Sequence, residues 1–133
     1  DYLAGGDGDD RLIGGPALDT LTGGQGADVF VYKTLGQSRV GPNKREVIVA
    51  FEPGVDKIDL GAIDAVRDTS SDDGFIFIGT TPFAAYSTTA GHMRIVKLAN
   101  YTLVRGDVDG DGRIDFDIAL LGVRDLTADD FIL

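Results

Sequence analysis

The fold of this chain is decided by three consecutive nonapeptides: GGDGDDRLI (residues 5–13), GGPALDTLT (14–22) and GGQGADVFV (23–31). Each begins with two glycines and has an aspartate at its sixth position. The aspartates that therefore fall nine residues apart are Asp10, Asp19 and Asp28. The apolar residues with the same spacing are Leu12, Leu21 and Phe30. Asp1 and Leu3 fit this register as the tail of a preceding copy, so we expect the array to extend upstream.

Such a repeat is typical of a solenoid in which each unit gives a tight turn and then a short strand. Glycine accepts positive φ, which lets backbone carbonyls converge in the turn, and the aspartate adds a charged oxygen. A cation between neighbouring turns would neutralise carboxylates that otherwise repel one another. The alternative is a set of Asp/Gly turns without metal. The second repeat departs from the pattern at Pro16 and Ala17.

The composition excludes several classes of protein. The chain has 133 residues, 19 glycines, no cysteine and a net charge of −10. Without cysteine there are neither disulfides nor thiolate metal sites, and without a basic stripe a nucleic-acid partner is disfavoured. We expect no membrane insertion, because no apolar run approaches the ~20 residues of a membrane-spanning helix. The first residues do not resemble a signal peptide, so we expect the chain to start inside a longer protein.

Beyond the repeats the sequence is typical of short strands. Strands are predicted at 46–51, 57–60, 75–78 and 114–121, and a hairpin at 92–98 and 101–105. Residues 33–45 are polar and predict a loop. Only residues 127–131 look helical, with Thr127 as N-cap. We therefore predict one all-β domain over residues 1–133, in which a short parallel β-roll (1–32) continues into an antiparallel β-sandwich (33–133).

A second candidate metal site lies at residues 107–115. Acids spaced as in the first part of an EF-hand loop, with glycine at the sixth position, are Asp107, Asp109, Asp111 and Asp115. Ile118 stands where an EF-hand has its bidentate glutamate, and strands flank the loop. This combination resembles the calcium hairpins between blade strands of integrin-type propellers. The alternative is an Asp/Gly hairpin turn without metal.

Several motifs, in their order and spacing, resemble the C-terminal domain of serralysin-type (peptidase M10) metalloproteases, which other type I-secreted RTX proteins share. These are the GGxGxD array, GADVFVY (26–32), FEPGVDKIDL (51–60), FIFIG (75–79) and LTADDFIL (126–133). The resemblance implies a calcium-binding folding and secretion module of an extracellular protein. It implies a preceding catalytic domain, a zinc metalloprotease by this likeness, and a type I secretion ABC transporter that engages the C-terminus.

The resemblance also implies the calcium ligands, which in this family are turn carbonyls and repeat aspartates. Here they are Asp1, Gly6, Gly8, Asp10, Gly15, Ala17, Asp19, Gly24, Gly26 and Asp28. Because ions lie between turns stacked on the same edge, Asp10 should share a site with Asp28, and Asp1 with Asp19. Relatives close a last site with acids after the repeats. Gln37 and Glu46 stand at those positions here, and Ala50 replaces a common aspartate, so metal binding there is left open.

The C-terminus and the repeats together suggest how such a module is exported. Residues 129–133 are acidic and then apolar, as in the export signals of these relatives. At low cytosolic calcium the acidic repeats would repel one another and stay unfolded. Outside the cell, calcium binding would fold them.

No catalytic constellation is found in the sequence. His92 is the only histidine, which excludes the HExxH zinc motif, and we expect it to be a surface residue. There is no cysteine nucleophile and no Gly-x-Ser-x-Gly elbow, and the Asp72-Asp73 pair is typical of a polar loop. We therefore expect a non-catalytic module. The alternative function is a carbohydrate-binding or adhesive module of a polysaccharide-active enzyme, with Tyr32, Tyr86 and Tyr101 as the aromatic residues available for sugar stacking.

Overall fold

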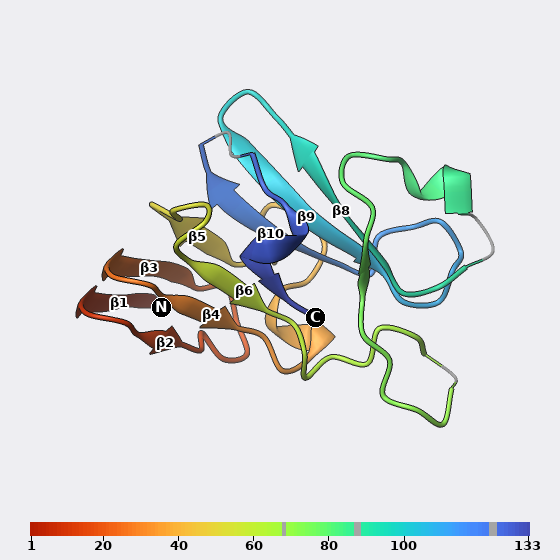
Figure 1. Ribbon diagram of the computed structural model, residues 1–133, viewed down its shortest axis with the longest axis horizontal. Coiled ribbons are helices and arrows are strands. Elements are labelled where there is room, and N and C mark those ends of the chain that lie inside the picture. The colour runs from red at the N-terminus through yellow and green to blue at the C-terminus, as the bar shows by residue number, and fades with distance from the viewer. Residues whose placement is uncertain (68, 87–88, 123–124) are drawn as a thin grey trace.

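The nonapeptides form the two-sheet roll that their spacing predicts. The computed structural model describes residues 1–67, 69–86, 89–122 and 125–133. The strands of the repeats are β1 (Tyr2–Asp7), β2 (Arg11–Leu12), β3 (Thr20–Gln25) and β4 (Val29–Val31). β1 pairs with β3 and β2 with β4, both parallel and both offset by 18 residues. One coil of the roll therefore takes two nonapeptides, and alternate repeats lie in opposite sheets (Figure 1).

The two sheets of the roll continue past the last repeat. β5 (Val47–Val49) pairs parallel with β3, and β6 (Lys57–Asp59) pairs parallel with β4. The short 3-10 helix η1 (Leu35–Gln37) lies in the connection that precedes β5. The polar loop predicted at 33–45 thus carries the chain from one sheet of the roll to the other.

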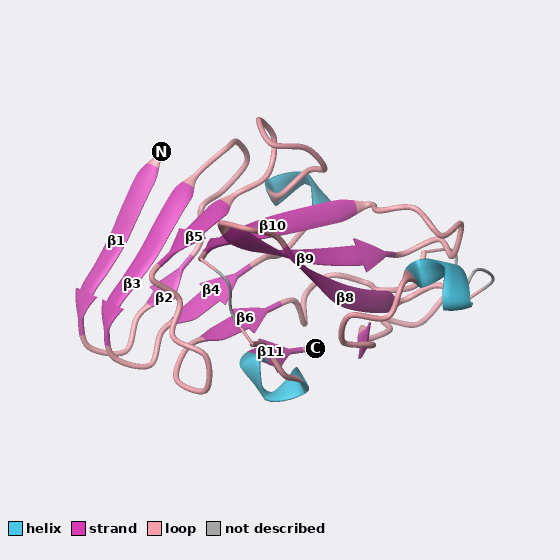
Figure 2. Cartoon of the chain, turned by 90° about the horizontal axis from the view of Figure 1, so that it is seen from above, coloured by secondary structure: helices cyan, strands magenta, loops and turns pink. Residues whose placement is uncertain are grey.

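The antiparallel part of the molecule extends the first of these sheets. Its strands are β8 (His92–Lys97), β9 (Tyr101–Asp107) and β10 (Phe116–Leu121), and β10 lies parallel to β5. With β7 (Ile76–Phe77) beside β8, the larger sheet has the order β1-β3-β5-β10-β9-β8-β7. The smaller sheet has the order β11-β6-β4-β2 and includes the C-terminal strand β11 (Phe131–Ile132). Figure 2 shows the roll strands passing into the longer antiparallel strands.

One apolar core lies between the two sheets. It contains the repeat residues Leu12, Leu21 and Phe30 together with Ile48, Ile58, Val104, Phe116, Ile118 and Phe131. Phe30 and Phe51 pack with ring centroids 6.0 Å apart, and Phe77 packs on Phe131 at 5.3 Å. Burial of this apolar surface is the main stabilising term of the fold.

The predicted fold class, an all-β roll that continues into antiparallel strands, is confirmed. The helical turn predicted at 127–131 is η3 (Ala128–Asp130), with Thr127 at its N-cap. Two further short helices, η1 and η2 (Phe83–Tyr86), were not predicted. Their sequences carry no apolar helix period, since 3-10 turns of this length are set by local hydrogen bonds. Among the described residues, no helix is long and apolar enough to cross a membrane.

Candidate metal sites

The turns of the roll depend on glycine at positions where another residue would collide. Gly6, Gly8, Gly24 and Gly26 have φ between 107° and 132°, a region that residues with a side chain rarely adopt. A Cβ on Gly24 would lie 2.0 Å from the carbonyl oxygen of Gly6, and one on Gly26 would lie 2.3 Å from that of Gly8. The first and third turns are therefore stacked in backbone contact, as the predicted sharing of ions requires.

A ladder of hydrogen bonds joins the aspartates of stacked turns. The amide N–H of Asp10 donates to Oδ1 of Asp28 at 2.9 Å, and the N–H of Asp28 donates to Oδ1 of Asp56 at 3.0 Å. On the opposite edge the N-terminal nitrogen of Asp1 donates to Oδ1 of Asp19 at 2.7 Å. The structure thus brings together both predicted pairs, Asp10 with Asp28 and Asp1 with Asp19.

The other oxygen of each repeat aspartate has no such use. Oδ2 of Asp10, Asp19 and Asp28 is buried, and no described residue gives it a hydrogen bond. Asp19 and Asp28 are only 1% and 0% exposed. A buried carboxylate oxygen without a partner costs several kcal/mol, and a hard cation would remove that cost. The donor set, carboxylate and carbonyl oxygens only, is the set that calcium prefers.

The second turn keeps the geometry of the others despite its altered sequence. Gly15 has φ 96°, and Ala17, where the pattern has glycine, has φ 155°. Ala17 therefore occupies a region of backbone conformation that is essentially restricted to glycine. The Pro16-Ala17 substitution changes the residues of the turn and leaves its positive φ in place.

Glu46 lies against the second turn. A Cβ on Gly14 would lie 2.3 Å from Oε1 of Glu46 and 2.8 Å from Oδ2 of Asp19, so both carboxylates crowd the same point. Glu46 is 1% exposed, and neither of its oxygens accepts a hydrogen bond within the described ranges. Burial raises the pKa of Glu46 to about 7; the nearby Tyr32 hydroxyl lowers this pKa, and the Asp19 carboxylate raises it.

Gln37, the other residue left open by the sequence, serves a different purpose. Its Oε1 accepts hydrogen bonds from the amides of Lys33 (2.5 Å) and Thr34 (3.0 Å) and so closes η1. The oxygen faces the backbone of its own loop, and the structure brings Glu46 without Gln37 to Asp19. Ala50 adopts φ 58° just before Phe51.

Glu46 and Asp56 are the residues of the two edges that nine-residue counting misses. Both follow the repeats at irregular distances, but each keeps the local pattern of acid, any residue, apolar residue. Ile48 lies beside Leu21 and Ile58 beside Phe30 in the register of the sheets. Matching the short pattern without its spacing could have found them. The Asp56 carboxylate also accepts the amide of Glu52 at 2.9 Å, and burial raises its pKa.

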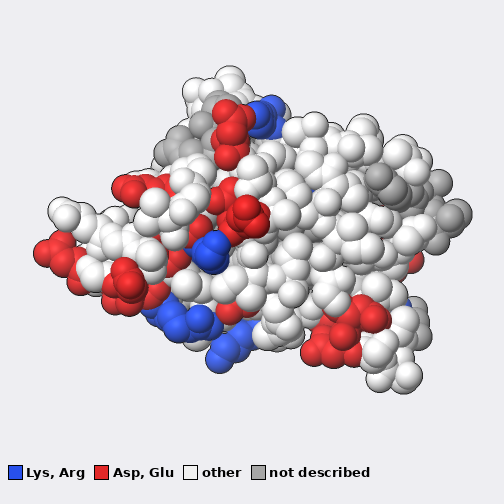
Figure 3. Space-filling model, viewed as in Figure 1, with Lys and Arg blue, Asp and Glu red and all other residues white. Residues whose placement is uncertain are grey.

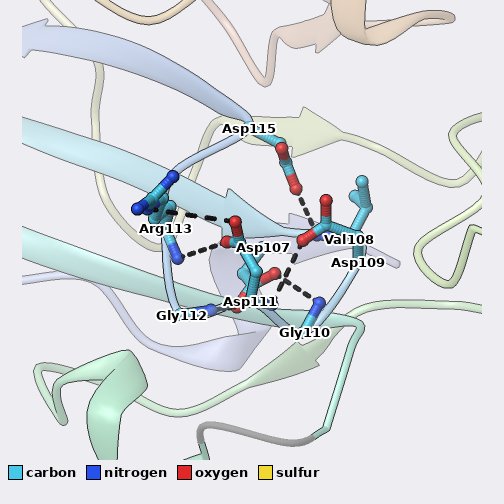
Figure 4. A network of polar contacts seen from close by, with 8 residues as sticks. All are labelled: Asp107, Val108, Asp109, Gly110, Asp111, Gly112, Arg113 and Asp115. Atoms are coloured by element: carbon cyan, nitrogen blue, oxygen red, sulfur yellow. Dashed lines mark hydrogen bonds and ion pairs between the residues drawn. The ribbon is translucent and has the colours of Figure 1, made fainter.

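The predicted acidic hairpin joins β9 to β10 (Figure 4). Asp107, Asp109 and Asp115 each place a carboxylate oxygen within 4.8 Å of the other two. Oδ1 of Asp107 accepts the amide of Gly110 at 2.7 Å, and Oδ2 accepts that of Gly112 at 2.9 Å. Three of the four predicted acids therefore converge on one point at the end of the hairpin.

Asp111 is the predicted ligand that the hairpin leaves out. It accepts the amide of Arg113 at 2.7 Å and lies outside the three-carboxylate group. Asp115 closes the group and accepts the amide of Val108 at 2.8 Å. Burial raises the pKa of Asp115, the Val108 amide lowers it, and the neighbouring carboxylates of Asp109 and Asp107 raise it again. Such mutual repulsion would be relieved by a cation among the three.

Acidic side chains gather at the end of the roll toward which β1 and β3 run, at the left of Figure 3. The candidates considered for other chemistry do not assemble a site. His92 is 4% exposed, so the expectation of a surface residue was wrong; its Nδ1 lies 2.8 Å from the carbonyl oxygen of Thr89. Asp73 accepts hydrogen bonds from Thr69 and Ser71 within its own loop.

The aromatic residues considered for sugar stacking are largely engaged elsewhere. Tyr32 is buried in the core, and the Tyr101 ring lies 5.6 Å below the guanidinium of Arg45. The side chain of Tyr86 is outside the described part of the chain. The two described side chains are thus packed within the protein.

Comparison with known proteins agrees with this geometry. Residues 2–133 match the family described as peptidase M10 serralysin C terminal. The fold is similar to the solution structure of the AlgE6R3 subunit of the Azotobacter vinelandii mannuronan C5-epimerase. The two share 25% identity with a TM-score of 0.63, over 98% of this chain and 66% of that one. The AlgE6R2 subunit of the same enzyme shares 24% identity with a TM-score of 0.63, over 100% and 87%.

A comparison with curated protein sequences finds no match. The family match nevertheless covers nearly the whole chain, including the repeats, the hairpin and the C-terminal strand. The chain therefore belongs to the family of peptidase M10 serralysin C-terminal domains.

Proposed function

We propose that this chain is the calcium-binding, non-catalytic C-terminal folding and secretion module of a larger extracellular protein. The observation that carries the proposal is the set of buried carboxylate oxygens without hydrogen-bond partners at both edges of the roll: Oδ2 of Asp10, Asp19 and Asp28 and both oxygens of Glu46. Calcium fits this set better than magnesium, because the turns offer many carbonyl and carboxylate oxygens without the strict octahedral geometry that magnesium demands.

Two kinds of calcium site follow from the geometry. Sites of the first kind lie between stacked turns, with the repeat aspartates and the carbonyls of Gly6, Gly8, Gly15, Ala17, Gly24 and Gly26 as ligands. The Asp19 edge gains Glu46, whose two free oxygens allow bidentate binding. The second kind is the hairpin, where Asp107, Asp109 and Asp115 would hold one ion.

Calcium binding would also decide when the module folds. Without the ion, folding must bury several unpaired carboxylates close together, which opposes the hydrophobic gain of the core. Binding to the folded state alone shifts the equilibrium toward it. We propose that the low calcium of the cytosol keeps the module unfolded for type I secretion, and that the calcium outside folds it. The C-terminal residues 129–133 would then engage the ABC transporter before folding.

Titration of the chelated protein with calcium, followed by calorimetry and far-UV circular dichroism, tests the proposal. We expect several bound ions, and a gain of β signal that depends on calcium and is not reproduced by magnesium at the same concentration. A protein with equal β content in chelator and in calcium would contradict coupled folding. Heat of binding that survives in a variant with Asp10, Asp19 and Asp28 all changed to Asn would contradict the assigned sites.

The parent protein is part of the proposal. By family, we propose a serralysin-type zinc metalloprotease whose catalytic domain precedes this module in the chain. An HExxH motif in the adjoining sequence of the parent protein is the expected finding, together with loss of exported protease when residues 126–133 are deleted. Export that is unchanged by this deletion would remove the C-terminal signal.

A second candidate function is the binding of an acidic polysaccharide. A pocket of about 340 Å³ lies beside the second turn and is lined by Pro16, Ala17, Leu18, Gly36, Arg39, Asn43 and Lys44. Its two cations stand out on a chain of net charge −10, and the similar solved structures belong to a mannuronan epimerase. Calorimetry of the calcium-loaded module with mannuronate oligomers, and with neutral glucan oligomers as control, tests it. Only salt-sensitive binding that is lost in the double variant Arg39→Gln, Lys44→Gln supports this function.

A further inference from the structure

The residues that carry Glu46 are fixed to the antiparallel part of the molecule by a buried polar network. The network joins the loop between η1 and β5 to strand β10. Its members are Ser38 and Arg45 from the loop and Asp117 from β10, all between 1% and 7% exposed. Such a network is unusual in position, because Asp117 lies on the sheet face opposite to the core residues Phe116 and Ile118.

Each bond of the network bears on the residue next to the metal site. Nη1 of Arg45 donates to Oδ2 of Asp117 at 2.7 Å. The hydroxyl of Ser38 donates to the carbonyl oxygen of Asp117 at 2.5 Å and accepts the amide of Glu46 at 2.9 Å. Asp117 is thus connected to the backbone of Glu46 through the Ser38 hydroxyl, and to its chain neighbour through the ion pair.

The backbone of Glu46 is held on its other sides as well. The amide of Ala119, two residues beyond Asp117, donates to the carbonyl oxygen of Glu46 at 3.0 Å. The amide of Val47 donates to the carbonyl oxygen of Asp19 at 3.0 Å. Glu46 therefore stands at the junction where the roll meets β10, with its peptide groups tied to both and its carboxylate turned to Asp19 and Gly14.

We infer that Asp117, with Arg45 and Ser38, is a positioning group for the Asp19–Glu46 calcium site and couples that site to the antiparallel sheet. The inference rests on the proposed calcium function. The network touches no oxygen assigned to the ion, so it acts only by fixing where Glu46 lies. Stability alone is a weak reason for such a group, because a buried ion pair is often replaced by apolar residues without loss.

The arrangement of charges agrees with a positioning role. Oδ1 of Asp117 receives no hydrogen bond in the described part of the chain, and its second cation, Arg105, lies 3.8 Å from Oδ2. Asp117 is thus held in one direction, by Arg45 and toward the loop. Outer groups that orient metal ligands typically alter metal affinity tenfold to a hundredfold when they are removed.

Three variants test the inference by calcium titration. Glu46→Gln identifies the binding class that belongs to the Asp19–Glu46 site. Asp117→Asn should then weaken this class by about tenfold or more and leave the remaining classes within about twofold. Ser38→Ala, which changes no charge, should weaken the same class, and this separates positioning from a long-range Coulomb effect of the lost carboxylate. Asp59→Asn is the matched control, because Asp59 forms an exposed 3.1 Å ion pair with Arg11 on the other sheet.

Terbium luminescence gives a reading of this one site. The chain has no tryptophan, and Tyr32 lies close enough to Glu46 that each carries a share of the other's pKa shift. Terbium bound beside Glu46 should therefore be sensitised by Tyr32, and Tyr32→Phe should remove that emission. In Asp117→Asn and Ser38→Ala the emission should require about tenfold more terbium, while Asp59→Asn matches the unaltered protein.

The possible outcomes are distinct. A uniform loss of affinity at every class in Asp117→Asn and Ser38→Ala means a merely structural role and overturns the inference. Unchanged affinity of the Glu46 class in Ser38→Ala overturns it as well, including the case in which Asp117→Asn fails to fold. If the unaltered protein binds no calcium, the proposed function itself fails, whatever the variants show.

Discussion

Ala17 has a backbone conformation that the equivalent residues of the neighbouring turns leave to glycine. Its φ of 155° compares with 107° at Gly8 and 132° at Gly26. Conformations of this kind cost about 1–3 kcal/mol for a residue with a Cβ. The cost is borne because the hydrogen-bonded strands on both sides, and the carboxylates of Asp19 and Glu46, leave the second turn no other path.

Ala17→Gly should therefore stabilise the protein. We expect a gain of about 1 kcal/mol, since relief of strain exceeds the extra chain entropy that glycine gives to the unfolded state. Urea unfolding in saturating calcium measures it. Ala27→Gly is the matched control, because Ala27 lies in the neighbouring turn at an ordinary φ, and it should lose up to about 1 kcal/mol. Equal changes in the two variants would refute strain at Ala17.

Glu46 should give the calcium-free protein an inverse dependence on pH. Burial raises its pKa from 4.5 to about 7, so the folded protein holds a proton that the unfolded chain releases between these values. Its contribution to stability is fully present below pH 4.5 and is lost as the pH rises through 7. Calcium reverses the trend, because only the carboxylate binds the ion.

The unfolding free energy in chelator, compared between unaltered protein and Glu46→Gln at several values from pH 5 to 8, measures this effect. The difference between the two proteins should change with pH in chelator, in favour of Glu46→Gln at the higher values. In calcium the unaltered protein should be the more stable at pH 8. A difference that is constant across this range would show that Glu46 keeps an ordinary pKa.

The residues of the two edges show how far the sequence reaches. Spacing identifies Asp10, Asp19 and Asp28 because every repeat must place its turn at the same point of the coil. It does not identify Glu46 and Asp56, since the connections before them have their own lengths and the roll requires only that β5 and β6 reach register. Their roles depend on backbone paths of 18 and 28 residues, Asp28 to Glu46 and Asp28 to Asp56, that no local pattern encodes.

At the scale of the element, the hairpin between β9 and β10 separates structural from metal-binding acids. Asp107 is buried and satisfies the amides of Gly110 and Gly112, whose positive φ values shape the loop. Asp109 is exposed and accepts only the amide of Asp111 at 3.1 Å. The first should matter with or without calcium, and the second chiefly with it.

We expect Asp107→Ala to destabilise the protein by about 2 kcal/mol in chelator and in calcium alike, because two loop amides lose a buried acceptor. Asp109→Asn should change stability in chelator by less than about 0.5 kcal/mol and should reduce the stabilisation that calcium gives. Urea unfolding in both conditions provides all four values. Full calcium stabilisation in Asp109→Asn would remove the hairpin from the metal sites, while Asp111→Asn, outside the group, should leave it unchanged.

The same hairpin shows what spacing predicts within an element. The EF-hand-like spacing was sufficient for Asp107, Asp109 and Asp115 to converge. Asp111 was predicted with them, but antiparallel strands fix both ends of the loop close together, unlike the helices of an EF-hand. The middle of the loop then turns outward, and Asp111 caps the amide of Arg113. Side-chain direction in a tight loop follows from its flanking elements, which sequence spacing does not contain.

For the whole molecule, both ends of the chain depend on the roll. The C-terminal strand β11 lies beside β6, and the amide of Leu60 donates to the carbonyl oxygen of Ile132 at 2.8 Å. Oδ1 of Asp130 accepts the amide of Gly54 at 2.7 Å, in the turn that leads to Asp56. Phe131 is buried in the shared core. The proposed export signal is thus part of the folded structure and is docked on the Asp10–Asp28–Asp56 edge.

Removal of calcium should therefore release the C-terminal strand together with the roll. Without the ion, the carboxylates of Asp10 and Asp28 repel each other, and the turn at Gly54 loses the edge against which it packs. Hydrogen exchange followed by mass spectrometry should show protection of the Leu60 and Gly54 amides in calcium and its loss in chelator. Asp130→Asn should reduce this protection in calcium, because the acceptor of Gly54 loses its charge. Asp129→Asn, next to it and exposed, should not. A C-terminal strand that stays protected in chelator would mean that the export signal is hidden before secretion, and the proposed order of export and then folding would fail.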